Sequence, residues 1–105
     1  MNDGIVLTKI DGRGIAEVTL NRPERNNAYN GEMISELIKS FTSLYDNNNV
    51  RIVLIRGLGK HFQGGADLEW LKEIGKLNEQ QNIEVSRKTA SAIKGLMEFP
   101  KPTIA

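Results

Sequence analysis

The chain has 105 residues and a formal net charge of +1, with 39% hydrophobic and 26% charged residues. These values fit one small globular domain and exclude a disordered chain. The absence of cysteine excludes disulfides and thiolate metal sites, and the single His61 cannot form a histidine cluster, so we expect no metal. The near-neutral charge argues against nucleic-acid binding. Because no apolar run approaches the roughly 18 residues of a membrane span and no secretory signal is visible, we expect a cytoplasmic protein without membrane contacts.

The first part of the chain has the pattern of a β-hairpin. Residues 4–10 are rich in β-forming side chains, and residues 15–20 alternate between two faces. The sequence DGRG at 11–14 is a strong turn signal between them. Residues 21–30 then form an asparagine-rich loop.

A helix and a strand follow this loop. Asn30 is a good N-cap, and the apolar residues between Met33 and Tyr45 fall on one face of a helix over residues 31–46. The uncharged run IVLI then predicts a strand over residues 50–56, which we expect to be buried on both faces.

Two further helices are predicted after a second, glycine-rich loop. Asp67 caps a short helix over residues 68–74, and Asn78 caps a longer one that reaches about Phe99. The residues of the longer helix at core spacing are Ala90, Ile93, Leu96 and Met97. Residues 103–105 begin another strand, and we expect other parts of the protein, or other copies, to cover an apolar face of the sheet.

The two loops should meet at one edge of the sheet. A strand–helix–strand unit over residues 15–56 usually makes two parallel strands, so the loops at 21–30 and 57–67 leave the same edge. Ligands bind at this edge in open α/β sheets. The sequence therefore predicts that both loops face one site.

The start of the short helix should offer backbone donors to that site. We expect unpaired N–H groups at Ala66, Asp67 and Leu68, which suit an anion or a developing oxyanion. Gly64 and Gly65 have no side chains, so a ligand can approach their backbone closely.

Other site types fit less well. Lys60 is followed by His61 rather than by Ser or Thr, which excludes a Walker A loop, and Phe62 stands where a dinucleotide fingerprint needs its third glycine. We interpret His61 as a solvated loop residue rather than as part of a catalytic triad.

Several side chains near the loops have two possible roles. We favour helix capping over catalysis for Asp67. Trp70 either lines a pocket or packs in a core or subunit contact. Arg22 and Arg25 either bind phosphates or are ordinary loop charges. Glu24 either contacts a ligand through its backbone or has a solvated side chain with no binding role.

Three segments together resemble the crotonase, or enoyl-CoA hydratase/isomerase, superfamily. They are VTLNRPERNNAYN at 18–30, VRIVLIRG at 50–57 with FQGGADL at 62–68, and PKPTIA at 100–105. The resemblance implies an α/β, crotonase-like fold. Residues 1–105 would be the N-terminal part of an acyl-CoA-binding domain, truncated before the second oxyanion donor and the acid/base carboxylates.

The resemblance implies an acyl-CoA thioester as the ligand and an enolate as the stabilised species. It assigns the first oxyanion donor to the Ala66 N–H, and it makes coenzyme A part of the substrate, with no separate cofactor. The residues that match the CoA-binding positions are Glu24, Arg25, Asn26, Ala28, Gly64, Ala66, Asp67 and Leu68. It also implies homotrimers or hexamers.

Two functions stay open at this point. The first is an enzyme of the hydratase/isomerase family, a lyase that adds water to a 2-enoyl-CoA. With Trp70 after Asp67, the sequence here resembles the methylglutaconyl-CoA hydratase branch of this family, which often has an aromatic residue at that position. The second is a non-catalytic module that binds CoA or a partner. The sequence departs from the more common family residues at two places, the pair Gln63-Gly64 and the single residue Tyr29. These departures leave the acyl specificity open.

Overall fold

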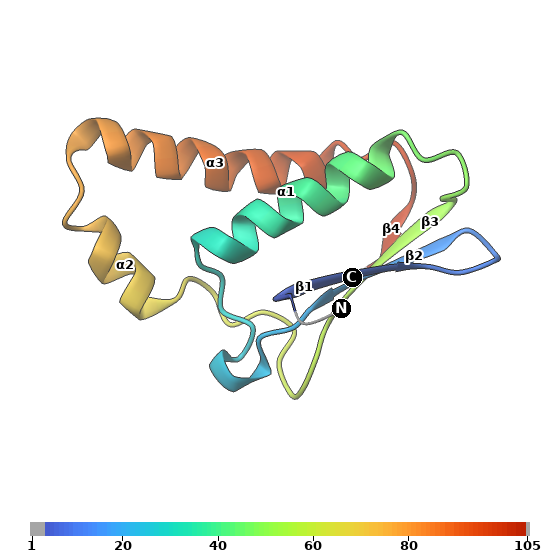
Figure 1. The fold of residues 1–105 in the computed structure, drawn as a ribbon, viewed down its shortest axis with the longest axis horizontal. Helices are drawn as coiled ribbons and strands as arrows, with labels where there is room; N and C mark the ends of the chain where they lie inside the picture. The colour runs from blue at the N-terminus through green and yellow to red at the C-terminus, as the bar shows by residue number, and fades with distance from the viewer. Residues whose placement is uncertain (1–3, 105) are drawn as a thin grey trace.

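A four-stranded sheet with two long helices over one of its faces forms the centre of the fold. The computed structural model describes residues 4–104, and Figure 1 shows α1 and α3 above the strands. The elements are β1 (Val6–Ile10), β2 (Ile15–Leu20), the 3-10 turn η1 (Pro23–Arg25), α1 (Gly31–Tyr45), β3 (Ile52–Gly57), α2 (Leu68–Ile74), α3 (Glu79–Met97) and β4 (Thr103–Ile104). This arrangement confirms the α/β fold class.

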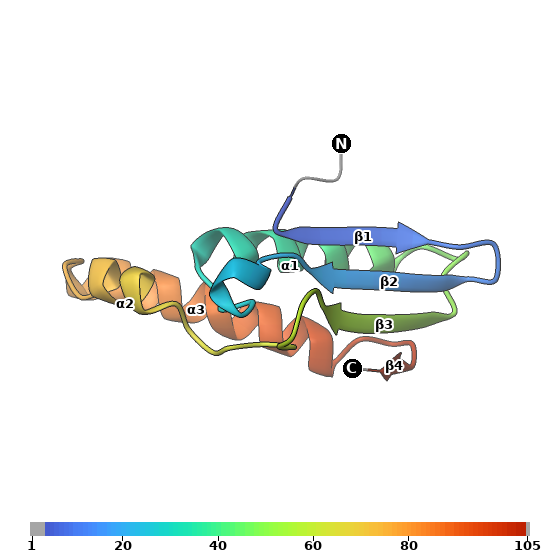
Figure 2. The same ribbon diagram turned by 90° about the horizontal axis from the view of Figure 1, so that it is seen from below.

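The sheet has the order β1-β2-β3-β4, and Figure 2 shows the strands side by side from below. β1 and β2 pair antiparallel as the predicted hairpin, with Val6 opposite Leu20. β2 and β3 pair in parallel, with Ala16 opposite Val53, and β4 continues the sheet in parallel. The parallel pairing places the loops after β2 and β3 at the same edge, as predicted.

The core lies between α1 and the sheet. The Asn30 side chain accepts a hydrogen bond from the Met33 N–H at 3.0 Å, which confirms it as the N-cap of α1. The buried core residues are Val6, Ala16, Val18, Leu20, Met33, Phe41, Leu44, Val50, Val53 and Ile55. Most of them alternate along the strands or follow the helical repeat, as their sequence spacing predicts.

The expectation that β3 is buried on both faces is wrong. Val53 and Ile55 are buried, whereas Ile52 and Leu54 are half-buried and Arg56 is exposed. Helices cover one face of the sheet within residues 4–104, and the other face carries the 3.0 Å ion pair of Arg56 with a β2 glutamate. The expectation that other parts of the protein, or other copies of it, cover this face of the sheet stays a prediction.

The predicted core face of α3 is also partly wrong. Leu96 is half-buried, but Ala90, Ile93 and Met97 are exposed. α3 instead turns the stripe Val85, Thr89, Ala92 and Leu96 toward α1. The helix offers two apolar stripes, and its own sequence does not tell which one meets α1.

None of the helices within residues 4–104 combines the length and the apolar character that a membrane span requires.

Candidate functional site

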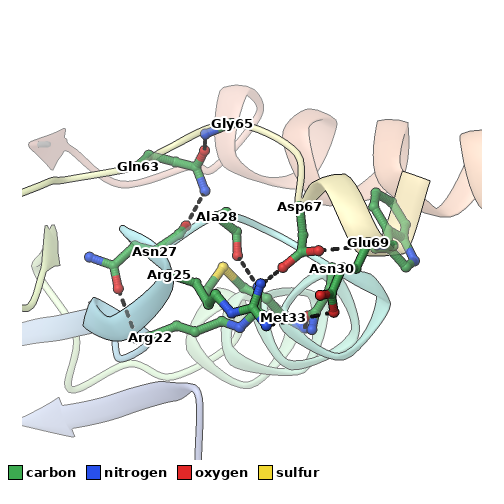
Figure 3. A network of polar contacts seen from close by, with 11 residues as sticks. Arg22, Arg25, Asn27, Ala28, Asn30, Met33, Gln63, Gly65, Asp67 and Glu69 are labelled. Atoms are coloured by element: carbon green, nitrogen blue, oxygen red, sulfur yellow. Dashed lines mark hydrogen bonds and ion pairs between the residues drawn. The ribbon is translucent and has the colours of Figure 1, made fainter. Parts of the chain in front are cut away.

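The loops that follow β2 and β3 lie against each other at the carboxyl ends of these strands (Figure 3). Tyr29 and Ala66 form a parallel β-bridge between them. The Tyr29 N–H donates to the Gly65 carbonyl, and the Asp67 N–H donates to the Tyr29 carbonyl, both at 2.8 Å. The bridge fixes the backbone of the second loop against the first, so the predicted meeting of the two loops is confirmed.

This bridge directs the Ala66 N–H away from the first loop. A trans peptide unit carries its carbonyl and the following N–H in opposite directions, and the Gly65 carbonyl faces Tyr29. The Ala66 N–H therefore points away from Tyr29, and it donates no hydrogen bond to any residue from 4 to 104. The same expectation of an unpaired N–H is wrong for Asp67, because the bridge uses that group.

Asn27 joins the two loops from the inside. Its side chain is 0% exposed, and its φ of 58° is a conformation that asparagine tolerates better than most residues. Its Oδ1 accepts from the Arg22 N–H at 2.8 Å, and its Nδ2 donates to the carbonyls of Leu58 and His61 at 2.9 and 2.7 Å. The asparagine-rich loop is the sequence signal for this role, but it does not tell which asparagine is buried.

Gln63 forms a second link between the loops. Its Nε2 donates to the Asn27 carbonyl at 2.6 Å, and its Oε1 accepts from the Gly65 N–H (Figure 3). Gly64 lies so close to the first loop that a Cβ there would be 2.8 Å from the Asn26 carbonyl oxygen. A side chain at this position would therefore force the loops apart.

Asp67 has a structural role at the start of α2. Its carboxylate is 5% exposed, accepts from the Trp70 N–H at 3.1 Å and lies 2.7 Å from Arg22 Nη1. The same Arg22 nitrogen donates to the Ala28 carbonyl at 2.9 Å. The capping role of Asp67 is confirmed, and Arg22 is engaged in this pair rather than left open for a phosphate.

The Asp67 contacts make stability depend on pH. The Trp70 N–H, followed by the Arg22 guanidinium, holds the pKa of Asp67 below its usual value of 3.8. A depressed folded-state pKa gives stability that is present above the unfolded pKa and is lost as the pH falls through the folded pKa. We expect Asp67→Asn to be less stable than the wild type at neutral pH, with a difference that shrinks as the pH falls below about 4.

Urea unfolding of both proteins between about pH 7 and pH 3 measures this difference. Asp46→Asn is the matched control, because Asp46 is exposed at the end of α1. A difference between wild type and Asp67→Asn that stays constant down to the acid limit would contradict the expected role of the charge.

The other residues predicted to bind CoA lie along the rim of the two loops. The exposed ones are Glu24, Arg25, Asn26, Gly64 and Leu68, whereas Ala28 and Ala66 are half-buried. Arg25 Nη2 lies 3.6 Å from the Glu69 carboxylate, and its side chain is 48% exposed, so it stays accessible to an anionic ligand. Glu24 and Arg25 belong to η1, which the sequence did not predict because one 3-10 turn has no periodic pattern.

The structure bears on the interpretations of Trp70 and His61. Trp70 packs edge-on against Tyr29, with ring centroids 5.7 Å apart, and it also lines a hollow formed by residues of α1 and α3. Both the packing role and the pocket-lining role offered by the sequence are therefore compatible with the structure. The His61 side chain is exposed, in agreement with its interpretation as a solvated loop residue.

An apolar cavity of about 230 Å³ lies between α1, α3 and the ends of β2 and β3. Its walls include Leu20, Tyr29, Ile34, Ile55, Gln63 and Ala92. Phe62 and Ile93 also line it and are 48% and 56% exposed, which places two large apolar side chains at its mouth. The sequence did not predict this cavity, because it depends on how far the two helices stand apart.

The cavity adjoins the loop site. Tyr29 lines the cavity and bridges to Ala66, and Gln63 lines it while holding the Gly65 N–H. An unpaired backbone donor, at Ala66, and a residue that lines the apolar cavity, Gln63, therefore lie three residues apart along the second loop. Within residues 4–104 no group of three or more histidine, aspartate or glutamate side chains is placed to hold a metal ion.

Comparison with known proteins gives consistent results. Residues 11–105 match the enoyl-CoA hydratase/isomerase family model. A human protein named enoyl-CoA hydratase domain-containing protein 2, mitochondrial, is 33% identical over 89% of this chain and 31% of its own length. A Streptococcus mutans protein named trans-2-decenoyl-[acyl-carrier-protein] isomerase is 32% identical over 94% of this chain and 38% of its own length.

The solved structures that resemble this chain include enzymes named for the same family as these relatives. The crystal structure of an enoyl-CoA hydratase from Shewanella pealeana superposes with a TM-score of 0.90 at 33% identity, over 94% of this chain and 37% of that one. The chain spans between 31% and 39% of the length of the curated relatives it matches. Because the family model covers nearly all of the sequence, the chain belongs to the enoyl-CoA hydratase/isomerase family of the crotonase superfamily.

Proposed function

We propose that the full-length protein binds an acyl-CoA thioester at the two loops and adds water to a 2-enoyl-CoA. The observation that carries this proposal is the unpaired Ala66 N–H beside an apolar cavity. A thioester carbonyl at Ala66 would place its acyl chain toward the cavity walls and its coenzyme toward the exposed rim. CoA is then part of the substrate, and no separate cofactor is needed.

The Ala66 N–H would stabilise the charge that develops during the reaction. When the water oxygen bonds to Cβ of the enoyl group, the electron pair of the double bond moves toward the carbonyl and the thioester oxygen becomes negative. An acid/base carboxylate from the part of the protein outside this chain would take one proton from the water, and a proton is delivered to Cα as the carbonyl re-forms. A fixed N–H aimed at this oxygen is worth more in the transition state than in the ground state.

The rim of the site would hold the coenzyme. Arg25 is an accessible cation there, 3.6 Å from the exposed Glu69, whereas Arg22 is paired with the buried Asp67. We propose that the exposed backbone and side chains of Glu24, Asn26, Gly64 and Leu68 contact the coenzyme, with Ala28 behind them. The second oxyanion donor and the acid/base carboxylates would come from the part of the full-length protein that this chain does not include.

Turnover by the folded full-length protein tests the proposal. We expect it to hydrate 2-butenoyl-CoA, with coenzyme A as a competitive inhibitor. Shift of the double bond of a 3-enoyl-CoA, without hydration, would instead identify an isomerase, which the Streptococcus mutans relative's name favours. Binding of CoA without turnover of any enoyl-CoA would identify the non-catalytic module, and neither binding nor turnover would overturn both readings.

The location and assembly of the protein are part of the same proposal. We propose a cytoplasmic homotrimer or hexamer, with the resemblance to the superfamily as its support. Light scattering of the purified full-length protein measures the oligomeric state.

A further inference from the structure

We propose that Gln63 is a positioning residue that fixes the Ala66 amide and gives the acyl cavity a neutral wall, so that the protein prefers uncharged aliphatic acyl groups. This inference rests on the proposed function. Gln63 belongs to the pair at which the sequence departs from the usual family residues, so its role is a property of this chain.

The backbone next to Ala66 needs such a restraint. Gly64 and Gly65 precede it, and Gly65 has a φ of 86° with no atom within 4 Å of where a Cβ would be. Two consecutive glycines leave a chain with much conformational freedom. Packing around Gly65 does not remove this freedom, so hydrogen bonds must do so.

Gln63 supplies the restraint on the side that precedes Ala66. Its Oε1 accepts from the Gly65 N–H while its Nε2 donates to the carbonyl of the buried Asn27. The Gly65 carbonyl and the Asp67 N–H are held by Tyr29 on the other side. Three consecutive peptide units are therefore fixed, and the Ala66 N–H lies in the middle one.

The same bonds determine what Gln63 shows to the cavity. Gln63 is exposed, but both polar atoms of its amide are hydrogen-bonded to backbone groups of the two loops, so its methylene groups are left to form the wall. Thr89, another polar residue of the wall, donates its hydroxyl to the Val85 carbonyl at 2.9 Å. No Lys, Arg, Asp or Glu side chain of residues 4–104 lines the cavity.

A charged acyl group would therefore be poorly accommodated. A carboxylate moved from water into an apolar cavity without a hydrogen-bonding or cationic partner loses its solvation and gains nothing in return. An uncharged alkyl chain gains from the same transfer. The cavity thus favours an aliphatic enoyl-CoA over the dicarboxylic acyl group that the methylglutaconyl branch implies.

Kinetics of the full-length protein test the positioning role. We expect Gln63→Met, which keeps the length of the side chain but removes both hydrogen bonds, to lower kcat for 2-hexenoyl-CoA by about 10- to 100-fold. The Kd for free coenzyme A should change by less than about twofold, because the exposed rim is not altered. Gln81→Met is the matched control, because Gln81 belongs to the capping box of α3.

The acyl preference is measured on the wild type. We expect kcat/KM for 2-hexenoyl-CoA to exceed that for glutaconyl-CoA, which carries a free carboxylate, by about 100-fold or more. Equal values for the two substrates would overturn the neutral-wall part of the inference. Unchanged kcat in Gln63→Met would overturn the positioning part.

Hydrogen exchange separates this inference from the proposed function. In folded Gln63→Met the Gly65 amide should exchange about 5-fold faster or more, whereas the Asp67 amide should keep its wild-type rate. Unchanged Gly65 exchange would overturn the inference even if the wild type is active. If the wild type turns over no enoyl-CoA, the proposed function fails, and faster Gly65 exchange still supports Gln63 as the restraint of this loop.

Discussion

Replacing the Ala66 N–H by an ester oxygen in the full-length protein is expected to lower kcat for 2-enoyl-CoA hydration by about 100- to 1,000-fold. The change removes one hydrogen-bond donor and keeps the side chain and the backbone path. The donor has no other partner within residues 4–104, so its loss breaks no hydrogen bond of the fold, although the ester carbonyl of Gly65 is a weaker acceptor for the Tyr29 N–H. We therefore expect the main effect in kcat, together with a small loss of stability.

The control for this variant is the same ester replacement at Leu68, at the first position of α2. That change should affect KM rather than kcat, because we place Leu68 at the coenzyme rim. Steady-state kinetics and urea unfolding of both variants give the comparison. Equal losses of kcat in the two variants, or an Ala66 ester with wild-type kcat, would contradict the role of the Ala66 N–H.

Asn27→Ala is expected to lower the free energy of unfolding by about 3 kcal/mol. The substitution leaves the Arg22 N–H and two carbonyls without the partner they have in the wild type, in a place where Asn27 is 0% exposed. It also places alanine at a φ of 58°, which costs alanine more than asparagine. Both effects act at the junction of the two loops.

Urea unfolding of the full-length protein measures this loss. Asn48→Ala is the matched control, because Asn48 is exposed in the turn after α1, and it should change the free energy by less than about 0.5 kcal/mol. A similar small change for Asn27→Ala would show that the buried hydrogen bonds do not hold the loops together.

Local patterns predicted much of this fold. Asn30, Asp67 and Asn78 cap the three helices as their positions before apolar repeats indicate. The glycine-rich turn joins the predicted hairpin, and the order of strands and helices predicted the parallel pairing of β2 with β3. These features depend on neighbours in sequence or on general rules of connection, so one sequence is enough to find them.

The burial predicted for α3 and β3 was wrong where contacts with distant elements determine which residues are covered. Ile93 and Met97 have helical core spacing but lie on the exposed stripe of α3, because α1 meets the other stripe. Leu54 sits in an uncharged run, yet the face it belongs to has no covering layer within residues 4–104. Neither fact is encoded in the spacing of the residues themselves.

In the candidate site, too, general rules of connection predicted some features, whereas contacts between distant residues determined the others. The topology predicted that the two loops meet. The sequence offered the N–H groups of Ala66, Asp67 and Leu68, and the family resemblance singled out Ala66. The sequence did not predict that Tyr29 takes the Asp67 N–H, or that Asn27 and Gln63 link the loops. Those bonds depend on the distance between two backbones, which only the folded chain defines.

The most direct test of the role of Ala66 is the amide spectrum of the 15N-labelled full-length protein with and without butanoyl-CoA, a saturated thioester that cannot be hydrated. At saturation the Ala66 amide proton should shift downfield, because it gains a carbonyl acceptor, whereas the Asp67 amide should shift much less because it is already bonded to Tyr29. An Ala66 amide that does not move in the saturated complex would contradict the assignment of this group as the donor to the thioester oxygen.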